Sequence, residues 1–270
     1  MGLSLKFWVG VLCAGLWSAT MGATAQAQDA KSIVQQAVAT ELEANRTDNS
    51  HWRYRRTDAD GNSFIVVETE HGAIGRHVNV GGKPAPAATL AADDAQIQKF
   101  IHDPEMQRKQ RGNGAQDDKS AVELLNLMAR AFVWKVDGVT QESILLSYRP
   151  DPSFHPPDME ARVMGAMSGT MVIDRAQHRI RTMRGRLEHD VTIGFGLLAR
   201  IKAGSVFDVE RRQVGPGYWE ISETHVHVSG HALFIKTIGD QEDEVKSEFM
   251  MVPPGTTLEQ AVGLMMKVAK

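Results

Sequence analysis

Three histidines near residue 230 are the side chains of this sequence best suited to bind a metal ion. His225 and His227 are two residues apart in a run of alternating polar and β-branched residues, and His231 follows the pair Ser229-Gly230, which predicts a tight turn. Residues two apart in a strand share a face, so His225 and His227 would lie side by side. Imidazoles at this spacing suit zinc or copper. The alternative is a solvated or hydrogen-bonded sheet face that holds no ion.

The segment 191–201 is the candidate ligand-binding surface. It is apolar, contains two glycines and lacks the polar residues of an ordinary loop, which predicts either a strand pair buried in the core or a surface that lines a groove or touches lipid. Methionines are frequent before it, and their flexible side chains fill irregular cores or line adaptable apolar grooves. On the groove interpretation, the ligand-binding residues are Ile193, Phe195, Leu197, Leu198, Met171 and Met183.

The composition excludes several function classes. The chain has 270 residues, of which 42% are hydrophobic and 23% charged, and its formal net charge is −3. These are the values of an ordinary soluble globular protein. No basic excess is present to neutralise phosphates, so we expect no nucleic-acid partner. The nucleotide-binding, zinc-protease and nucleophile-elbow motifs GxGxxG, GxxxxGK[ST], HExxH and GxSxG are absent, which argues against the common dehydrogenases, kinases and hydrolases.

The first 27 residues have the three parts of a secretory signal peptide. Lys6 precedes an apolar run over 7–17, and small residues follow up to Ala25-Gln26-Ala27. Cleavage after Ala27 would leave residues 28–270 as a periplasmic or secreted protein. The apolar run is too short to cross a bilayer, so we expect no transmembrane span in the mature chain. The single cysteine, Cys13, lies in the signal, so the mature chain would carry neither thiol nor disulfide.

Periodicity predicts an α+β fold, a long curved antiparallel sheet (an incomplete β-barrel) with helices over its concave face. Residues 28–270 would form one domain, with a possible sub-boundary at the proline-rich connector 149–158 and a polar linker at 107–119. The expected helices are 29–45, 92–102, 120–131 and 257–268. The expected strands are 51–57, 63–70, 73–80, 132–136, 143–148, 166–174, 179–188, 205–214, 218–229, 232–238 and 244–251.

The strand–turn–strand pattern of residues 169–174 and 180–187, and the later run 218–221, resembles the lipoprotein-carrier group of the bacterial envelope, which includes LolA-like, LolB-like and RseB-like proteins. The resemblance implies an incomplete β-barrel closed by helices around an apolar cavity that binds acyl chains or partner peptides. It is one of pattern, so no functional residue of that group is assigned to a position here.

These observations favour an exported, non-catalytic binding or carrier protein of the bacterial envelope, without a cofactor. Its partner would be a lipid or acyl ligand, or an envelope protein. One alternative is a metal-binding protein or enzyme centred on His225, His227 and His231, with zinc or copper. Another is an envelope scaffold that contacts proteins through its sheet edges.

Export is tested by the intact mass of the protein recovered from the envelope fraction. We expect a chain that begins at Gln28 or Gln26 and has no lipid attached, because the small residues before these positions suit signal cleavage. A mass that includes Met1, or one that includes a diacylglycerol group, would contradict this prediction.

Overall fold

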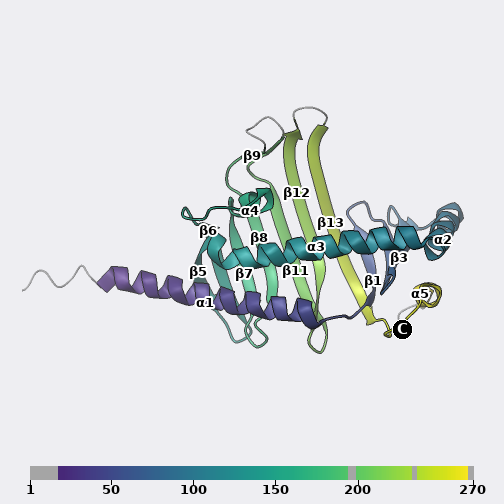
Figure 1. Ribbon diagram of the computed structural model, residues 1–270, viewed down its shortest axis with the longest axis horizontal. Coiled ribbons are helices and arrows are strands. Elements are labelled where there is room, and N and C mark those ends of the chain that lie inside the picture. Colours follow the sequence, from purple (N-terminus) through teal and green to yellow (C-terminus); the bar gives the residue numbers. More distant parts are fainter. Residues whose placement is uncertain (1–17, 194–198, 233–235, 267–270) are drawn as a thin grey trace, which may run out of the picture.

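Strands dominate the computed structural model, which describes residues 18–193, 199–232 and 236–266 (Figure 1). A single antiparallel sheet of 13 strands runs through the molecule in the order β4-β3-β2-β1-β13-β12-β11-β8-β7-β6-β5, and the short pair β9–β10 extends β12. The sheet is open, with β4 and β5 at its edges. The predicted α+β fold with an open antiparallel sheet is confirmed.

The helices and strands have the following bounds. The helices are α1 (Ser18–Thr47), α2 (Ala87–Ile101), α3 (Pro104–Ala131), α4 (Met159–Met164) and α5 (Leu258–Met265). The strands are β1 (Trp52–Asp58), β2 (Ser63–Thr69), β3 (Gly72–Val80), β4 (Lys83–Pro84), β5 (Phe132–Val139), β6 (Ser143–Pro150), β7 (Met167–Asp174), β8 (Ile180–Leu187), β9 (Val191–Ile193), β10 (Ala199–Ile201), β11 (Val206–Gly215), β12 (Tyr218–Ala232) and β13 (Lys236–Met251).

The main core lies where α1 and the C-terminal part of α3 cover β5, β6, β7 and the start of β8. Alternate residues of these strands point at the helices, and Leu146, Met171 and Ile173 have no exposed surface. From α1, Val34 and Ala37 are equally buried. We call the side of the sheet that meets α1 and α3 the inner face and the opposite side the outer face.

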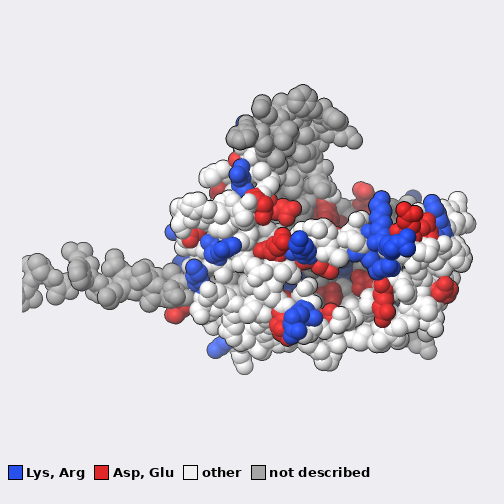
Figure 2. All heavy atoms as spheres, viewed as in Figure 1, with Lys and Arg blue, Asp and Glu red and all other residues white. Residues whose placement is uncertain are grey.

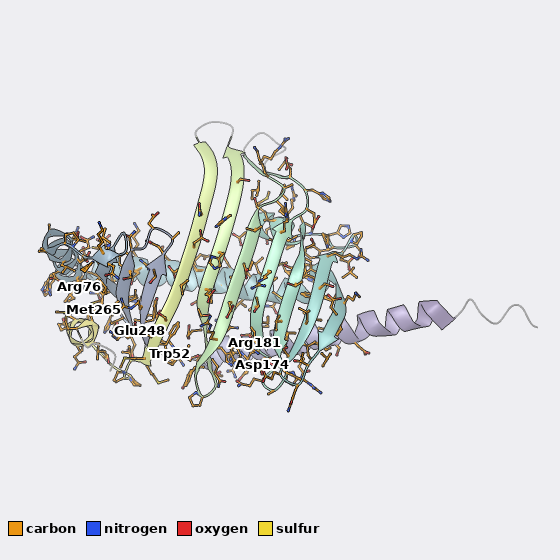
Figure 3. The ribbon with its side chains drawn as sticks, turned by 180° about the vertical axis from the view of Figure 1, so that it is seen from behind. Trp52, Arg76, Asp174, Arg181, Glu248 and Met265 are labelled. Atoms are coloured by element: carbon orange, nitrogen blue, oxygen red, sulfur yellow. The ribbon has the colours of Figure 1, made fainter. Side chains whose placement is uncertain are left out.

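A second core lies at the other end of the sheet, on the outer face. There α2 and α5 cover β2 and β3 and bury Ile65, Val67 and Ile74. Val66, between the first two, belongs to a separate aromatic cluster on the inner face. The two helical layers therefore pack on opposite sides of one sheet, as a strong twist over many strands allows. Figure 3, seen from behind, shows Met265 of α5 at this end and the long helices beyond the strands.

A buried ion network fastens α1 to the sheet. The Glu41 carboxylate lies 3.0 Å from the guanidinium of Arg179 and 2.6 Å from that of Arg211, and it accepts a hydrogen bond from the backbone N–H of Ile180. Burial alone would raise the pKa of Glu41, but Arg211 and Arg179 together lower it below its ordinary value. The carboxylate therefore stays charged and holds α1 against β8 and β11.

Helix α3 corrects the sequence analysis, which took 107–119 as a linker. It is one continuous helix of 28 residues. The Asp103 side chain accepts hydrogen bonds from the backbone N–H groups of Glu105 and Met106, and Pro104 occupies the first turn, where it costs no hydrogen bond. The polar residues Gln, Arg and Lys are good helix formers, so the segment stays helical although Gly112 and Gly114 lower its propensity.

The hairpin of β12 and β13 also differs from the prediction. Ser229-Gly230 is no turn, and no separate strand begins at 232, because β12 continues to Ala232 while pairing with β13. Gly230 is required by a close approach instead, since a Cβ there would lie 2.5 Å from the carbonyl oxygen of Arg200 in β10. Helix α4 lies between the expected connector 149–158 and the expected strand 166–174. It begins after Asp158, whose side chain accepts a hydrogen bond from the backbone N–H of Ala161.

The structure describes only part of the predicted signal peptide. Residues 18–27 belong to α1, which thus begins earlier than expected, and residues 1–17 lie outside the described residues. Within the ranges that the structure describes, no helix combines the length and the apolar composition needed to cross a membrane.

Replacing Glu41 tests the buried network. Glu41→Gln removes the charge that two arginines share, so we expect a loss of about 3 kcal/mol in the free energy of unfolding, measured with urea. Glu43→Gln is the matched control, because Glu43 lies two residues away in an exposed pair with Arg46. An equal, small effect of both substitutions would show that the network does not hold α1.

Candidate functional site

Helix α3 is anchored at its two ends. Near its start, the Gln110 amide exchanges two hydrogen bonds with the backbone of Ala73 in β3, of 2.7 and 3.0 Å, and Arg111 donates to the carbonyl of His71. Near its end, Leu127 and Met128 are buried in the main core. The elements that α3 packs against are α1, α2, α4, β3 and β5.

The central part of α3 is exposed all round. Every residue from 108 to 119 is solvent-exposed, including those on the side of the helix turned toward the sheet. Figure 1 shows α3 crossing the inner face from the α2 end of the sheet toward β5, and the bonds of Gln110 place the beginning of this part over β3. A helix that is polar on all sides is typical of a bridge through solvent, not of a helix packed on a core. Apart from Gln110 and Arg111, which reach the backbone of residues 71–73, this part of α3 is a polar strap without packed side chains.

Farther along the inner face, toward the main core, β8, β11 and β12 carry apolar side chains. Met183 pairs with Val209, and Phe207 pairs with Val226, so these residues share the inner face with the buried Met171. Unlike Met171, they are only half-buried, as is Val228 farther along β12. We call Met183, Phe207, Val209, Val226 and Val228 the apolar floor.

Carboxylates border the floor where the inner face continues to β13. Glu244 pairs with Thr224 of β12 and forms ion pairs with Arg56 (3.5 Å) and Lys246 (3.3 Å). Glu242, two residues earlier on the same strand and face, is exposed. Figure 2 shows Lys and Arg side chains gathered at the α2 end of α3, where Arg108 and Lys109 are exposed. The apolar floor is thus bordered by acidic groups on its β13 side.

Two more carboxylates lie beyond this border, and both have pKa values above the ordinary range. Glu68 of β2 accepts a hydrogen bond from the backbone N–H of Trp52, yet burial raises its pKa above the ordinary value. Burial, followed by the negative charges of Glu68 and Asp48, raises the pKa of Glu220 to about 7. This end of the inner face therefore gains negative charge as the pH rises through neutrality.

The predicted histidine pair lies on the outer face. His225 and His227 share that face, as the strand pattern predicted, and both bind Asp243 of β13, with nitrogen–oxygen distances of 2.8 and 2.9 Å. Hydrogen bonds from Gln241 and then from the two imidazoles hold the pKa of Asp243 far below its usual range. A further carboxylate, Glu223, lies 3.9 Å from His225.

His225 and His227 therefore lie on a hydrogen-bonded sheet face, which is the alternative to a metal site that the sequence left open. Within the described part of the chain, no three His, Cys, Asp or Glu side chains are arranged to hold a metal ion. The backbone of His231 belongs to β12, but its side chain lies outside what the structure describes. The metal prediction for the three histidines thus stays a prediction.

The predicted ligand residues are distributed over different surroundings. Phe195, Leu197 and Leu198 lie outside the described residues, as does the side chain of Ile193 at the end of β9. Met171 is part of the main core, and Met183, at the edge of the apolar floor, is half-buried and packs against that core.

The sequence analysis missed the rest of the floor. Its signal was present, because Phe207 and Val209 alternate with Asp208 and Glu210 in the period of a strand. What the sequence did not indicate was that α3 would cross the face of the sheet to which these side chains belong.

Replacing Glu220 tests the charge at the border of the floor. A carboxyl whose pKa is raised in the folded state binds protons more readily than in the unfolded state, so stability falls as the pH rises from about 4.5 through about 7. We expect Glu220→Gln to remove most of this decline, at most about 3 kcal/mol between pH 5 and pH 8. Urea unfolding at both pH values measures it, with the exposed Glu70→Gln as control. A pH profile unchanged by Glu220→Gln would contradict the assignment.

Models of known protein families, curated proteins and solved structures were compared with this chain, and none of them matches it. The candidate site is therefore defined by its geometry.

Proposed function

We propose that the protein is an exported, non-catalytic binding or carrier protein that holds the apolar chain of an amphiphile between α3 and the apolar floor. The observation that carries this proposal is the floor of half-buried apolar side chains on the face of the sheet that α3 crosses. It supports a site that is open in the free protein and filled by a ligand.

Packing energetics support an apolar occupant. Protein interiors are close-packed, so apolar side chains that face a gap lose their dispersion contacts and remain in contact with water. Phe207 and Val226 are half-buried, whereas Met171 on the same face is buried in the main core. Each methylene group that leaves water for such a surface contributes about 0.8 kcal/mol, so a partly enclosed acyl chain binds usefully.

The charges around the floor favour a ligand whose head group is not purely anionic. Glu242 and Glu244 lie on the strand that borders the floor, and Glu220 adds charge above neutral pH. Carboxylates repel a fatty-acid head group and attract a quaternary ammonium group. Arg56 and Lys246, beside Glu244, provide the opposite charge. A zwitterionic head group, as in a lysophosphatidylcholine, suits both sets of charges.

The resemblance to the envelope lipoprotein-carrier group agrees with this proposal, because it implies an incomplete barrel that takes acyl chains. The open sheet and the helices on its inner face are the features that the two descriptions share.

A pair of neighbouring substitutions on β11 tests the proposal. Phe207→Asp places a charge in the floor, whereas Val206→Asp places it on the outer face, where Val206 pairs with Arg186 and His227. We expect Phe207→Asp to weaken the binding of a twelve-carbon lysophosphatidylcholine about tenfold or more and Val206→Asp to leave it unchanged. Tryptophan fluorescence and the ligand-dependent rise in melting temperature measure binding.

Two controls keep this test decisive. Circular dichroism reports whether Phe207→Asp folds, and if it does not, Val226→Thr changes polarity in the floor at nearly constant volume. The proposal is contradicted if the unmodified protein binds no lysophosphatidylcholine, or if the floor variants bind it as well as the unmodified protein does.

A further inference from the structure

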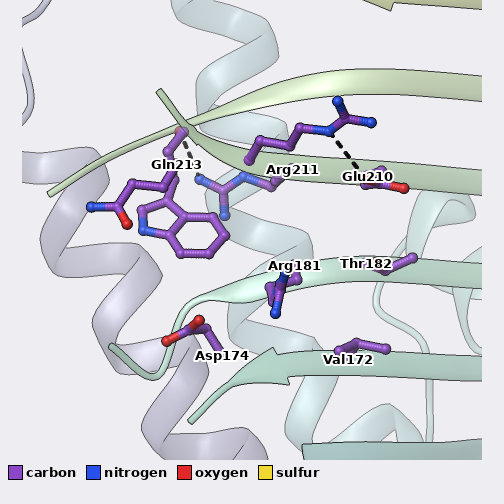
Figure 4. A pocket seen from close by; sticks show the side chains of 9 residues that line it. Val172, Asp174, Arg181, Thr182, Glu210, Arg211 and Gln213 are labelled. Atoms are coloured by element: carbon purple, nitrogen blue, oxygen red, sulfur yellow. Dashed lines mark hydrogen bonds and ion pairs between the residues drawn. The ribbon is translucent and has the colours of Figure 1, made fainter. Parts of the chain in front are cut away.

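A separate pocket lies on the outer face, over β7, β8 and β11. Its volume is about 550 Å³, and its lining includes Asp174, Arg181, Thr182, Glu210, Arg212 and Trp219 (Figure 4). Thr182 pairs with Val172 of β7 and with Glu210 of β11, and all three alternate with inner-face residues. The pocket is therefore on the side of the sheet away from the apolar floor.

Most charges in this pocket are already compensated. The guanidinium of Arg212 lies 3.2 Å from Glu210 and 2.6 Å from Glu223. The Oδ1 atom of Asp174 accepts hydrogen bonds from the backbone N–H groups of Ala176 and Gln177 in the adjoining turn. Arg211, which also lines the pocket, is committed to Glu41. The ion pairs leave little free charge on Arg211, Arg212 and Glu210, while Asp174 keeps its negative charge at one end of the pocket.

Arg181 is the exception. Among the residues that the structure describes, its guanidinium has no hydrogen bond and no ion pair. Its position has a backbone cause, because Val172 pairs with Thr182 but Ile173 pairs with Ile180, so Arg181 is the extra residue of a β-bulge. Bulges re-aim side chains. Figure 4 shows Arg181 between Asp174 on one side and Arg211 on the other.

The wall beside Arg181 is aromatic and fixed. Trp219 is only 7% exposed, and its indole N–H donates to the Gln177 side chain at 2.9 Å. Val172 adds an aliphatic surface to the lining. A pocket with one free guanidinium, a hydroxyl donor on Thr182 and a rigid apolar wall matches a small molecule that carries an oxyanion on a flat apolar body.

We infer that this pocket binds a small molecule bearing a carboxylate or phosphate group, which Arg181 and Thr182 receive while the apolar part of the molecule lies against Val172 and Trp219. Its volume is within the range of about 300–1,000 Å³ that small-molecule sites occupy. The site is independent of the apolar floor, because the two lie on opposite faces of the sheet.

Titration of the full chain with three probes tests this inference. Benzoate and phenyl phosphate carry the oxyanion, and benzamide is the neutral counterpart of benzoate. We expect at least one of the two anions to bind, with a change in tryptophan fluorescence, and benzamide to bind at least tenfold more weakly, because it lacks the charge that Arg181 receives. Tighter binding of benzoate would indicate a carboxylate ligand, and tighter binding of phenyl phosphate would indicate a phosphate ligand.

Two variants of β8 with the same change in charge locate the site. Arg181→Gln should weaken binding of the preferred anion about tenfold or more, whereas Arg186→Gln, an exposed arginine outside the pocket lining, should change it less than twofold. Phe207→Asp, on the other face, should have no effect. Absence of anion binding, equal binding of benzamide, or equal effects of the two arginine variants would overturn the inference.

Discussion

The fixed length of α3 is the constraint on which the rest of the arrangement depends. A helix of 28 residues is a rod about 42 Å long, and its ends are fastened to two cores on opposite faces of one sheet. The rod is packed at its C-terminal end, where Met128 and Ala131 are buried, whereas residues 108–119 of its first half are exposed. On the same face of the sheet, Phe207 and Val226 stay half-buried.

The distribution of stability follows from the same geometry. Under α1, the sheet is stabilised by the full burial of Leu146 and Met171 and by the charged network around Glu41. At the other end, α2 and α5 bury Ile65 and Val67. The long central strands β12 and β13 are held mainly by their own hydrogen bonds, with polar networks on the outer face such as the histidine pair on Asp243. Packing is therefore least complete in the middle of the sheet, where both proposed binding surfaces lie.

Local pattern predicted most strands, the first helix and the fold class, because alternation and helical spacing are properties of neighbouring residues. Tertiary context determined what the sequence analysis missed. Asp103 and the core contacts of Leu127 extend α3 through a polar segment that had been taken as a linker. Gly230 indicated a turn, but the glycine is there because β10 approaches its backbone. The face shared by His225 and His227 was predicted, whereas their common partner Asp243, 16 residues beyond His227, was not.

Hydrogen–deuterium exchange along α3 tests the central claim most directly. Helical amides without tertiary packing open more readily than packed ones. If α3 and the floor hold a ligand, amides in 108–119 exchange faster than those around Leu127 and Met128 in the free protein, and the amides of α3 slow when a twelve-carbon lysophosphatidylcholine is bound. Equal protection along the whole helix without ligand, or no change along α3 when the ligand is bound, would contradict the claim that α3 and the floor form a ligand site.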